Sequence, residues 1–229
     1  MMVTSEAESV NATDMKTGND TGLQHNHKEG YLIAKRVLDI FASLVGIMLT
    51  IVPMVIIALL IRLESPGSPL YIHKRVGKNG KELPLLKFRS MFKDADKMIE
   101  LFTPEQKAEW EENFKLEHDP RITKVGNFLR KSSLDELPQL FNVLMGDLSL
   151  VGPRPIVTKE LEKYGENKKK FLSVTPGLTG YWQAYARSDC SYEQRIQMEL
   201  NYAENANFWW DIKIMFATVG AVLRGKGAK

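Results

Sequence analysis

The sequence predicts an α+β fold, mainly helical, in which a re-entrant membrane helix hairpin precedes a small globular domain with a short β-hairpin and amphipathic interfacial helices. Three observations favour this fold. A run of 22 residues without a charged side chain extends from Ile40 to Ile61. Two short apolar stretches flank an Asn-Gly pair at residues 79–80, which is typical of a hairpin turn. Several later segments place apolar residues three or four positions apart, as amphipathic helices do.

The composition limits the class of protein. The chain has 229 residues, of which 44% are hydrophobic, and this suits one domain with appendages. Its net charge of +3 is too small to indicate nucleic acid binding, and its cations cluster beside the apolar run. We therefore expect anionic lipid or phosphate as a partner, and no nucleic acid. The single cysteine, Cys190, excludes an internal disulfide and fits a reducing cytoplasm.

Residues 1–29 are rich in Ser, Thr, Asn, Asp and Glu and show little periodicity. This composition predicts a disordered N-terminal tail. The segment lacks the cationic-then-apolar pattern of a signal peptide.

Residues 30–63 contain the apolar run, whose helix would be about 33 Å long and could cross a bilayer. Pro53 lies inside the run and is expected to break or kink the helix. The flanks on both sides are cationic, with Lys35 and Arg36 before the run and Arg62 after it. The positive-inside bias then favours both ends on the cytoplasmic side, so we predict a hairpin bent at Pro53 with arms of about 20 and 12 Å. A kinked single span is the alternative.

The β-hairpin is predicted from two strands, Leu70–Val76 and Leu83–Phe88. Pro84 cannot donate a ladder hydrogen bond, which restricts the second strand to a sheet edge. Most of the basic side chains of this hairpin are interpreted as a solvated face near anionic headgroups: His73, Lys74, Arg75, Lys78 and Lys81.

The rest of the chain predicts helices and loops. Helices are expected over Asp94–Phe102, from Thr103 to about Leu116, Thr158–Phe171, Tyr192–Asn205 and Phe208–Leu223. A capping box, Thr103 to Gln106, begins the second of these. In the last helix, the tandem Trp209-Trp210 suits the headgroup level of a membrane, and a helix docked on the core is the alternative.

The stretch from Arg130 to Pro155 contains the candidate site. Asp135 and Glu136 are adjacent carboxylates just after a pair of serines. Ser133 and Glu136 fit a capping box, so one interpretation is simply the start of a helix. Adjacent helical residues point about 100° apart, but at a first turn the two carboxylates can divide roles. One can then bind a metal or attack a substrate while the other accepts a proton.

A carboxylate attacks phosphorus only when the phosphate charge is neutralised by Arg, Lys or a divalent ion. No Walker or Rossmann motif is present to supply phosphate binding from the backbone. The candidate cations are Arg130, Arg154, Lys87 and Arg89. Arg154 is fixed between Pro153 and Pro155, and such a rigid arginine suits oxyanion binding.

The segment SLDELPQLFNVLMGDLSLVGPRP, Ser133 to Pro155, closely resembles the signature of the bacterial sugar transferases, also called monotopic phosphoglycosyl transferases or polyprenyl-phosphate sugar-1-phosphate transferases. The resemblance extends from about Lys35 to Gly225. It implies that Asp135 attacks the phosphate nearest the sugar of a UDP-sugar and releases UMP. Polyprenyl (undecaprenyl) phosphate would then take up the sugar phosphate, with Glu136 positioning or deprotonating it.

The resemblance also assigns binding residues. It implies that Lys87, Arg89, Arg130 and Arg154 bind the substrate phosphates, and that Mg²⁺ or Mn²⁺ is held partly by Asp135. It implies a nucleotide-sugar pocket made by Pro153, Pro155, Gln183 and Arg187. The chain departs from the family at two points, since Ala186 replaces the usual glycine before Arg187 and Val52 replaces the serine that often precedes the membrane proline.

The resemblance implies a place and a pathway as well. Residues 64–229 would form the catalytic domain, lying on the cytoplasmic face of a bacterial inner membrane. The partners would be a UDP-sugar, polyprenyl phosphate and membrane lipids, with a homodimer left open. The pathway would be the first membrane step of an exopolysaccharide, capsule, O-antigen or glycoprotein glycan. Two alternatives remain, namely a membrane-bound phosphohydrolase that uses water and a non-catalytic membrane scaffold.

Overall fold

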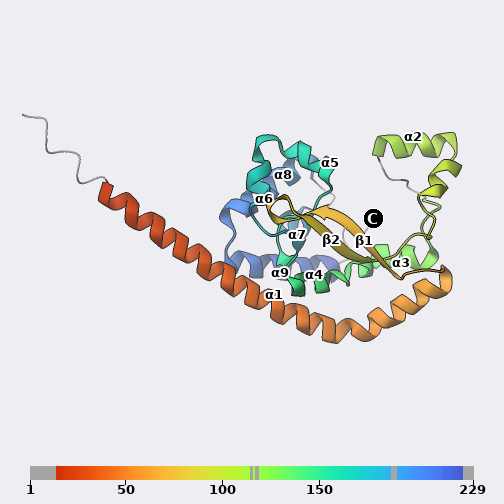
Figure 1. Cartoon of the computed structure of the whole chain (residues 1–229), viewed down its shortest axis with the longest axis horizontal. Helices are drawn as coiled ribbons and strands as arrows, with labels where there is room; N and C mark the ends of the chain where they lie inside the picture. The colour runs from red at the N-terminus through yellow and green to blue at the C-terminus, as the bar shows by residue number, and fades with distance from the viewer. Residues whose placement is uncertain (1–13, 114–115, 117–118, 187–189, 224–229) are drawn as a thin grey trace, which may run out of the picture.

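The computed structural model describes residues 14–113, 116, 119–186 and 190–223, and its longest element is helix α1, Asp14–Glu64. Figure 1 shows α1 passing beneath the other elements, where it contacts α3 (Lys124–Ser132), α4 (Gln139–Met145) and α9 (Phe208–Leu223). The described elements are mainly helical and include two small two-stranded sheets. This confirms the predicted α+β class.

One face of α1 packs against the globular part at helical spacing. The buried positions begin with polar residues and continue with apolar ones: Asp39, Ser43, Met54, Ile57 and Ile61. The segment Glu29–Glu64 is long and apolar enough to cross a membrane, and only 17% of its most apolar window is buried. Its outward face is covered with exposed apolar side chains, as a helix in contact with lipid requires.

The expected break at Pro53 is a bend within one helix. Pro53 lies inside α1, which curves around the globular part and does not divide into two separate helices (Figure 1). Proline removes one helical hydrogen bond without ending the helix when neighbouring groups satisfy the backbone.

The N-terminal expectation differs from the structure in part. Helix α1 begins at Asp14, within the segment 1–29 for which disorder was expected. Helix propagation from a formed helix costs little compared with nucleation, and the stable segment after Gly30 provides the nucleus. Residues 1–13 lie outside the described residues.

The predicted β-hairpin is confirmed. Strands β1 (Leu70–Val76) and β2 (Glu82–Phe88) pair antiparallel, with the turn at Asn79 in the left-handed conformation (φ +58°). Helix α4 covers the outer edge of β2 through Asn142. Its amide accepts from Leu86 N at 2.9 Å and donates to the Pro84 carbonyl at 2.9 Å. Pro84 therefore lies on an edge strand, as predicted, and its carbonyl is bonded by the Asn142 side chain and not by a further strand.

A second sheet fixes the loop that contains Arg154. Strand β3 (Ser149–Val151) pairs parallel with β4 (Gly177–Thr179). A Cβ on Gly177 would lie 2.0 Å from the Gly152 nitrogen, so only glycine permits this approach. Gly177 N donates to the Pro153 carbonyl at 2.9 Å. The loop after β3 is thus held against β4.

The later helices agree with the sequence to different degrees. Helices α8 (Tyr192–Asn205) and α9 have the predicted bounds. The capping box of α2 (Pro104–Asn113) forms between Thr103 and Gln106. The predicted helix Thr158–Phe171 is divided into α5 (Thr158–Leu161), a 3₁₀ segment and α6 (Lys168–Leu172), because Gly165 adopts φ +51° between them. Similarly, the helix expected from Asp94 is reduced to a 3₁₀ segment, Lys97–Leu101.

The two tryptophans of α9 lie on different sides of the helix: Trp209 is exposed and Trp210 is packed against the core. The Trp209 side chain is 72% exposed, which suits a membrane interface. Trp210 packs on Tyr181 and Tyr202, with ring centroids 5.0 and 5.6 Å away. Helix α9 is therefore docked on the core along one side and open on the other.

Candidate functional site

The two adjacent carboxylates lie on a short 3₁₀ turn, Leu134–Glu136, between α3 and α4. Ser133 precedes them in the left-handed conformation (φ +58°), where it ends α3. The predicted capping box is wrong, because the Ser133 side chain makes no cap bond and Glu136 binds a lysine from another element. A left-handed serine is an uncommon backbone state that is often found at functional sites.

Helix α3 is fixed at its start by the end of α1. Thr123 accepts a capping hydrogen bond from Gly126 N at 2.9 Å. The carboxylate of Glu64, the last residue of α1, accepts from Lys124 N at 2.7 Å and Val125 N at 2.9 Å. These bonds satisfy backbone donors that a helix start leaves free. The position of α3, and of the turn that follows it, depends on the end of α1.

Lys87 of β2 lies against both carboxylates. Its ammonium nitrogen is 2.8 Å from Glu136 Oε1 and 3.7 Å from Asp135 Oδ2. All three side chains are mostly buried, with exposed fractions of 17% for Lys87, 14% for Asp135 and 27% for Glu136. At this burial an ion pair interacts more strongly than it would in open water.

The two carboxylates have opposite pKa shifts. Burial raises the pKa of Asp135 above its ordinary value, Lys87 acts against this rise, and the neighbouring Glu136 adds to it. Burial also opposes ionisation of Glu136, but the charges of Lys87 and Arg154 outweigh it and hold the pKa of Glu136 below its ordinary value. Glu136 is therefore a fixed anion paired with Lys87, while Asp135 is the less stabilised and more reactive of the two.

Arg130 and Arg154 each act on one of the two carboxylates, Arg130 on Asp135 and Arg154 on Glu136. Arg130, in the last turn of α3, donates through Nε to Ser90 Oγ at 2.8 Å, and its charge lowers the pKa of Asp135. Arg154 is held through its backbone, where its N–H donates to Glu199 Oε1 at 3.2 Å. Within the described residues its guanidinium makes no hydrogen bond or ion pair. The guanidinium of Arg154 is thus available to an anionic ligand.

Arg89 does not join this group. Its guanidinium donates to the Ser65 carbonyl at 2.5 Å and to the Pro66 carbonyl at 2.9 Å. It closes the turn between α1 and β1. The physical reason is that this turn leaves backbone carbonyls without partners, and a guanidinium satisfies two of them at once. A phosphate-binding role for Arg89 would require it to leave both carbonyls.

The residues expected around a nucleotide sugar come together in part. A small depression is lined by Lys87, Glu136, Arg154, Pro155 and Gln183, together with Arg75 and Gln139. Pro153 is buried behind it, where its carbonyl accepts from Gly177 N. Arg187 lies outside the described residues.

Arg75 is a site residue that the sequence reasoning missed. It was placed with the solvated cations of the hairpin, but its side chain is only 15% exposed and lines the depression. Strand alternation could have identified it. Side chains two residues apart share a face, and the register places His73 opposite Leu85 and Arg75 opposite Leu83. Lys87 lies on this same face, so a ligand bound at Lys87 is also within the reach of the face that Arg75 occupies.

The local field at the depression is positive. Burial, followed by the charges of Arg75, Lys87 and Arg154, lowers the pKa of His73 to about 4. His73 is therefore neutral at physiological pH. Cations that repel a further proton in this way are suited to bind an anion of high charge, such as a diphosphate.

The side chains near Asp135 could bind a divalent ion only together with oxygen ligands from the substrate. Among the described residues, no three His, Cys, Asp or Glu side chains converge to hold a metal. Mg²⁺ usually keeps several waters and uses one or two carboxylates beside substrate phosphates. Asp135 supplies one such carboxylate, whereas Glu136 is engaged by Lys87 at 2.8 Å. Asp135 is the residue that would hold such an ion here, and the substrate phosphates would have to supply further oxygen ligands.

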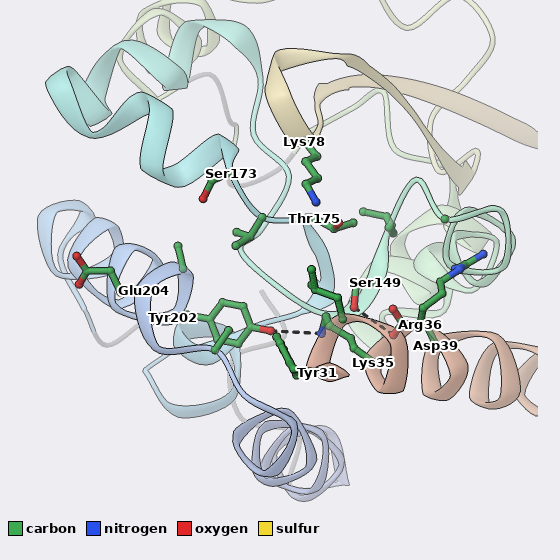
Figure 2. Close-up of a pocket in the computed structure, with 16 residues that line it drawn as sticks. Tyr31, Lys35, Arg36, Asp39, Lys78, Ser149, Ser173, Thr175, Tyr202 and Glu204 are labelled. Carbon is green, nitrogen blue, oxygen red and sulfur yellow. Dashed lines mark hydrogen bonds between the residues drawn. The ribbon is translucent and has the colours of Figure 1, made fainter. Parts of the chain in front are cut away.

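A larger cavity, of about 320 Å³, lies between α1, the loop after α4 and the end of α8 (Figure 2). Its lining includes none of the predicted site residues. Figure 2 shows Lys35 and Asp39 of α1 facing the globular part. Lys35 pairs with Asp211 at 2.7 Å, and Asp39 accepts from Ser149 Oγ at 3.1 Å. These groups already satisfy one another and attach α1 to the domain, so the size of this cavity does not identify the chemistry.

Comparison with known proteins agrees with the pattern of the site. A family model described as "Bacterial sugar transferase" matches residues 30–225. The UDP-galactose-lipid carrier transferase of Erwinia amylovora is 45% identical over 197 residues, which is 85% of this chain and 41% of that protein. The undecaprenyl-phosphate galactose phosphotransferase of Salmonella typhimurium is 48% identical over 198 residues, again 85% of this chain and 41% of that protein.

The relatives differ in length. The chain spans about two fifths of the two relatives just named. It also matches the exopolysaccharide production protein ExoY of Rhizobium meliloti, which is 41% identical over 199 residues, 86% of this chain and 88% of that protein.

Proposed function

The chain belongs to the bacterial sugar transferase family, and on that premise we propose that it transfers a hexose-1-phosphate from a UDP-sugar to polyprenyl (undecaprenyl) phosphate and releases UMP. The relatives named above act on UDP-galactose or undecaprenyl phosphate, as their names state. The observation that carries the proposal is the contact of Lys87 with both Asp135 and Glu136, two carboxylates with opposite pKa shifts. The exopolysaccharide protein among the relatives supports a role in the assembly of a surface polysaccharide.

In the first step, an ionised Asp135 oxygen attacks the phosphorus nearest the sugar. A bond from Asp135 to phosphorus forms, the bond from phosphorus to the bridging oxygen breaks, and UMP leaves with that electron pair. Asp135 suits this role because burial makes its carboxylate less stabilised than an exposed one. Arg130 and Arg154 neutralise the negative charge that would otherwise repel the attacking carboxylate.

In the second step, an oxygen of polyprenyl phosphate attacks the same phosphorus and Asp135 leaves as a carboxylate. Glu136, fixed as an anion by Lys87, positions this acceptor and takes up its proton where one is present. The product is a polyprenyl diphosphate sugar, and Asp135 returns to its starting state. Splitting the transfer into two displacements lets a soluble donor leave before a lipid acceptor enters.

Mg²⁺ or Mn²⁺ fits this proposal as an ion that Asp135 shares with the substrate diphosphate. When bound, it would supply further charge neutralisation at the phosphates. Lys87, Arg130 and Arg154 hold the diphosphate in position whether or not a metal assists.

The contacts of α1 support a re-entrant arrangement at the cytoplasmic face of the inner membrane. Lys35 is bound to Asp211 near one end of the apolar segment, and Glu64 caps α3 at the other end. These residues are about 44 Å apart along a helix, and a straight span of that length would place them on opposite sides of a bilayer. Both are attached to one polar domain, which cannot occupy both sides. A bent α1 that enters and leaves one leaflet satisfies both attachments.

The proposal is tested by measuring UMP release from a panel of UDP-sugars, with undecaprenyl phosphate and Mg²⁺ present. We expect release of UMP that depends on the lipid acceptor over repeated turnovers. Equal turnover without polyprenyl phosphate would instead identify a phosphohydrolase. No UMP from any sugar nucleotide, with α1 inserted normally, would favour a non-catalytic scaffold.

A further inference from the structure

We propose that Arg75 binds the phosphate that stays with the nucleoside when the sugar phosphate is transferred. Before this phosphate binds, Glu160 occupies Arg75, and the phosphate then displaces Glu160. The inference rests on the proposed function and adds to it a site for the leaving group. No motif in the sequence assigned such a role to either residue.

Arg75 is a buried cation whose contacts are all poor. Its guanidinium lies 3.6 Å from Glu160 Oε1, 3.5 Å from the Pro155 carbonyl and 3.5 Å from His73 Nδ1. Its Nε is buried without a hydrogen-bond partner among the described residues. A guanidinium bound well by an anion makes contacts of about 2.7–2.9 Å. Arg75 therefore has unused capacity for an acceptor that the protein itself does not supply.

Its neighbours show the same deficit of acceptors. Arg195 lies 3.8 Å from Glu160 and stacks on Trp182, with 4.7 Å from its guanidinium carbon to the ring centroid. Arg195 Nη2 and Trp182 Nε1 are also buried without partners in the described part of the chain. Buried donors without acceptors are costly, and native structures rarely keep them without a reason. A ligand rich in acceptor oxygens, such as a phosphate, would satisfy them.

The position of Arg75 selects which phosphate it binds. Arg75 on β1 lies opposite Leu83 on β2. Lys87 follows Leu83 by four residues on the same face of the hairpin, which is about 13 Å along β2. Both side chains line the one depression. Asp135 is at the Lys87 end, 3.7 Å from that lysine, so the phosphate it attacks must lie there. The Arg75 end is left for the second phosphate of the diphosphate.

Glu160 is the carboxylate that a phosphate would have to displace from Arg75. The free space in the depression is about 10 Å³, which is room for about one water. A phosphate can enter only if a side chain moves, and Glu160 is the anion that competes for Arg75. It has other partners to turn to, because Tyr192 donates to its Oε2 at 3.1 Å and Arg195 lies 3.8 Å away. Burial and the charge of Glu160 raise the pKa of Tyr192 to about 12, so this phenol remains a donor at neutral pH.

The test measures binding of UMP and of uridine to the full chain in lipid nanodiscs by titration calorimetry. Three variants are compared with the wild type: Arg75→Gln, Lys74→Gln and Glu160→Gln. Arg75→Gln is expected to weaken UMP binding about 10- to 100-fold and to leave uridine binding unchanged. Lys74→Gln removes the same charge one residue away, where the lysine is exposed and pairs with Glu82, and this change is expected to affect neither binding of UMP nor binding of uridine. Glu160→Gln is expected to tighten UMP binding, a gain that misfolding cannot produce.

The outcomes separate this inference from the proposed function. A wild-type chain that binds no UMP overturns both. If the wild type and Arg75→Gln bind UMP equally tightly, the inference alone is overturned. Equal losses of UMP and uridine affinity in Arg75→Gln show a structural role and also overturn it. UMP binding by Glu160→Gln that is unchanged or weaker overturns the part assigned to Glu160.

Discussion

Lys87 on strand β2 donates a 2.8 Å hydrogen bond to Glu136 on the turn between α3 and α4, two residues 49 positions apart in the chain. The same ammonium group lies 3.7 Å from Asp135. One cation thus fixes Glu136 as an anion and leaves Asp135 with a weaker contact. This asymmetry assigns different chemistry to two adjacent carboxylates.

The first prediction concerns Lys87. Replacing it with methionine removes the cation between the carboxylates, so Asp135 and Glu136 would repel each other and the substrate phosphates. We expect kcat/KM for UMP release to fall about 10²- to 10³-fold. The control is Lys81→Met, which removes an exposed lysine of the same hairpin and should leave the rate unchanged. Equal rates in the two variants would contradict the role given to Lys87.

The second prediction concerns stability at the two carboxylates. Because the pKa of Asp135 is raised in the fold, the folded chain holds this proton more tightly than the unfolded chain, and ionisation at neutral pH costs stability. Asp135→Asn should therefore raise the Tm at pH 7 while abolishing UMP release. Below about pH 3.9 Asp135 is protonated in both states, so the gain should disappear there.

Glu136→Gln is the matched variant with the opposite sign. The pKa of Glu136 is lowered in the fold, so its carboxylate contributes stability above its ordinary pKa, and this is lost as the pH falls. Glu136→Gln should lower the Tm at pH 7. Thermal denaturation of both variants followed by circular dichroism provides the comparison. Shifts of the same sign at pH 7 would refute the asymmetry.

The third prediction concerns the attachment of α3 to the end of α1. A glutamine at position 64 has only one acceptor oxygen, whereas Glu64 accepts from both Lys124 N and Val125 N. Glu64→Gln should lower the free energy of unfolding by about 1 kcal/mol, as the loss of a helix cap does. Glu82→Gln, which changes an exposed carboxylate of the hairpin, is the control. Denaturant titration in detergent measures both, and an unaltered midpoint in Glu64→Gln would show that the cap contributes nothing.

The fourth prediction concerns the loop that contains Arg154. Gly177→Ala places a methyl group 2.0 Å from the Gly152 nitrogen, so the loop must shift. We expect kcat/KM to fall about 100-fold, because displacement of a charge-stabilising group by about 1 Å has such an effect. Gly30→Ala meets nothing within 4 Å and should keep full activity. Wild-type kinetics in Gly177→Ala would show that the loop position does not matter to the reaction.

The elements that the sequence predicted well are those with strong local signals. The hairpin was predicted from Asn79-Gly80, and the start of helix α2 from the capping box between Thr103 and Gln106. The Asp135–Glu136 stretch was chosen as the candidate site from its residues and from the family resemblance, and its catalytic role stays a prediction. In each case the information lies within a few residues of the chain.

The features that the sequence did not predict depend on contacts between distant residues. Ser133 to Glu136 satisfies the local pattern of a capping box, but Lys87 draws Glu136 away and Ser133 adopts the left-handed conformation. Arg89 is held by the carbonyls of Ser65 and Pro66, and nothing in its own neighbourhood indicated that. Arg75 is buried because of the strand register and a helix that follows much later. Tertiary partners, which the local pattern does not contain, determine these three positions.

The central claim is that Asp135 carries the sugar phosphate between the two substrates. Its most direct test is intact-protein mass spectrometry after mixing the full chain with a UDP-sugar accepted in the UMP-release panel, without polyprenyl phosphate. We predict a mass increase of one hexose phosphate on the wild-type chain, located at Asp135 by peptide mapping and lost when undecaprenyl phosphate is added. The account is contradicted if no adduct forms while UMP is released, or if Asp135→Asn carries the same adduct.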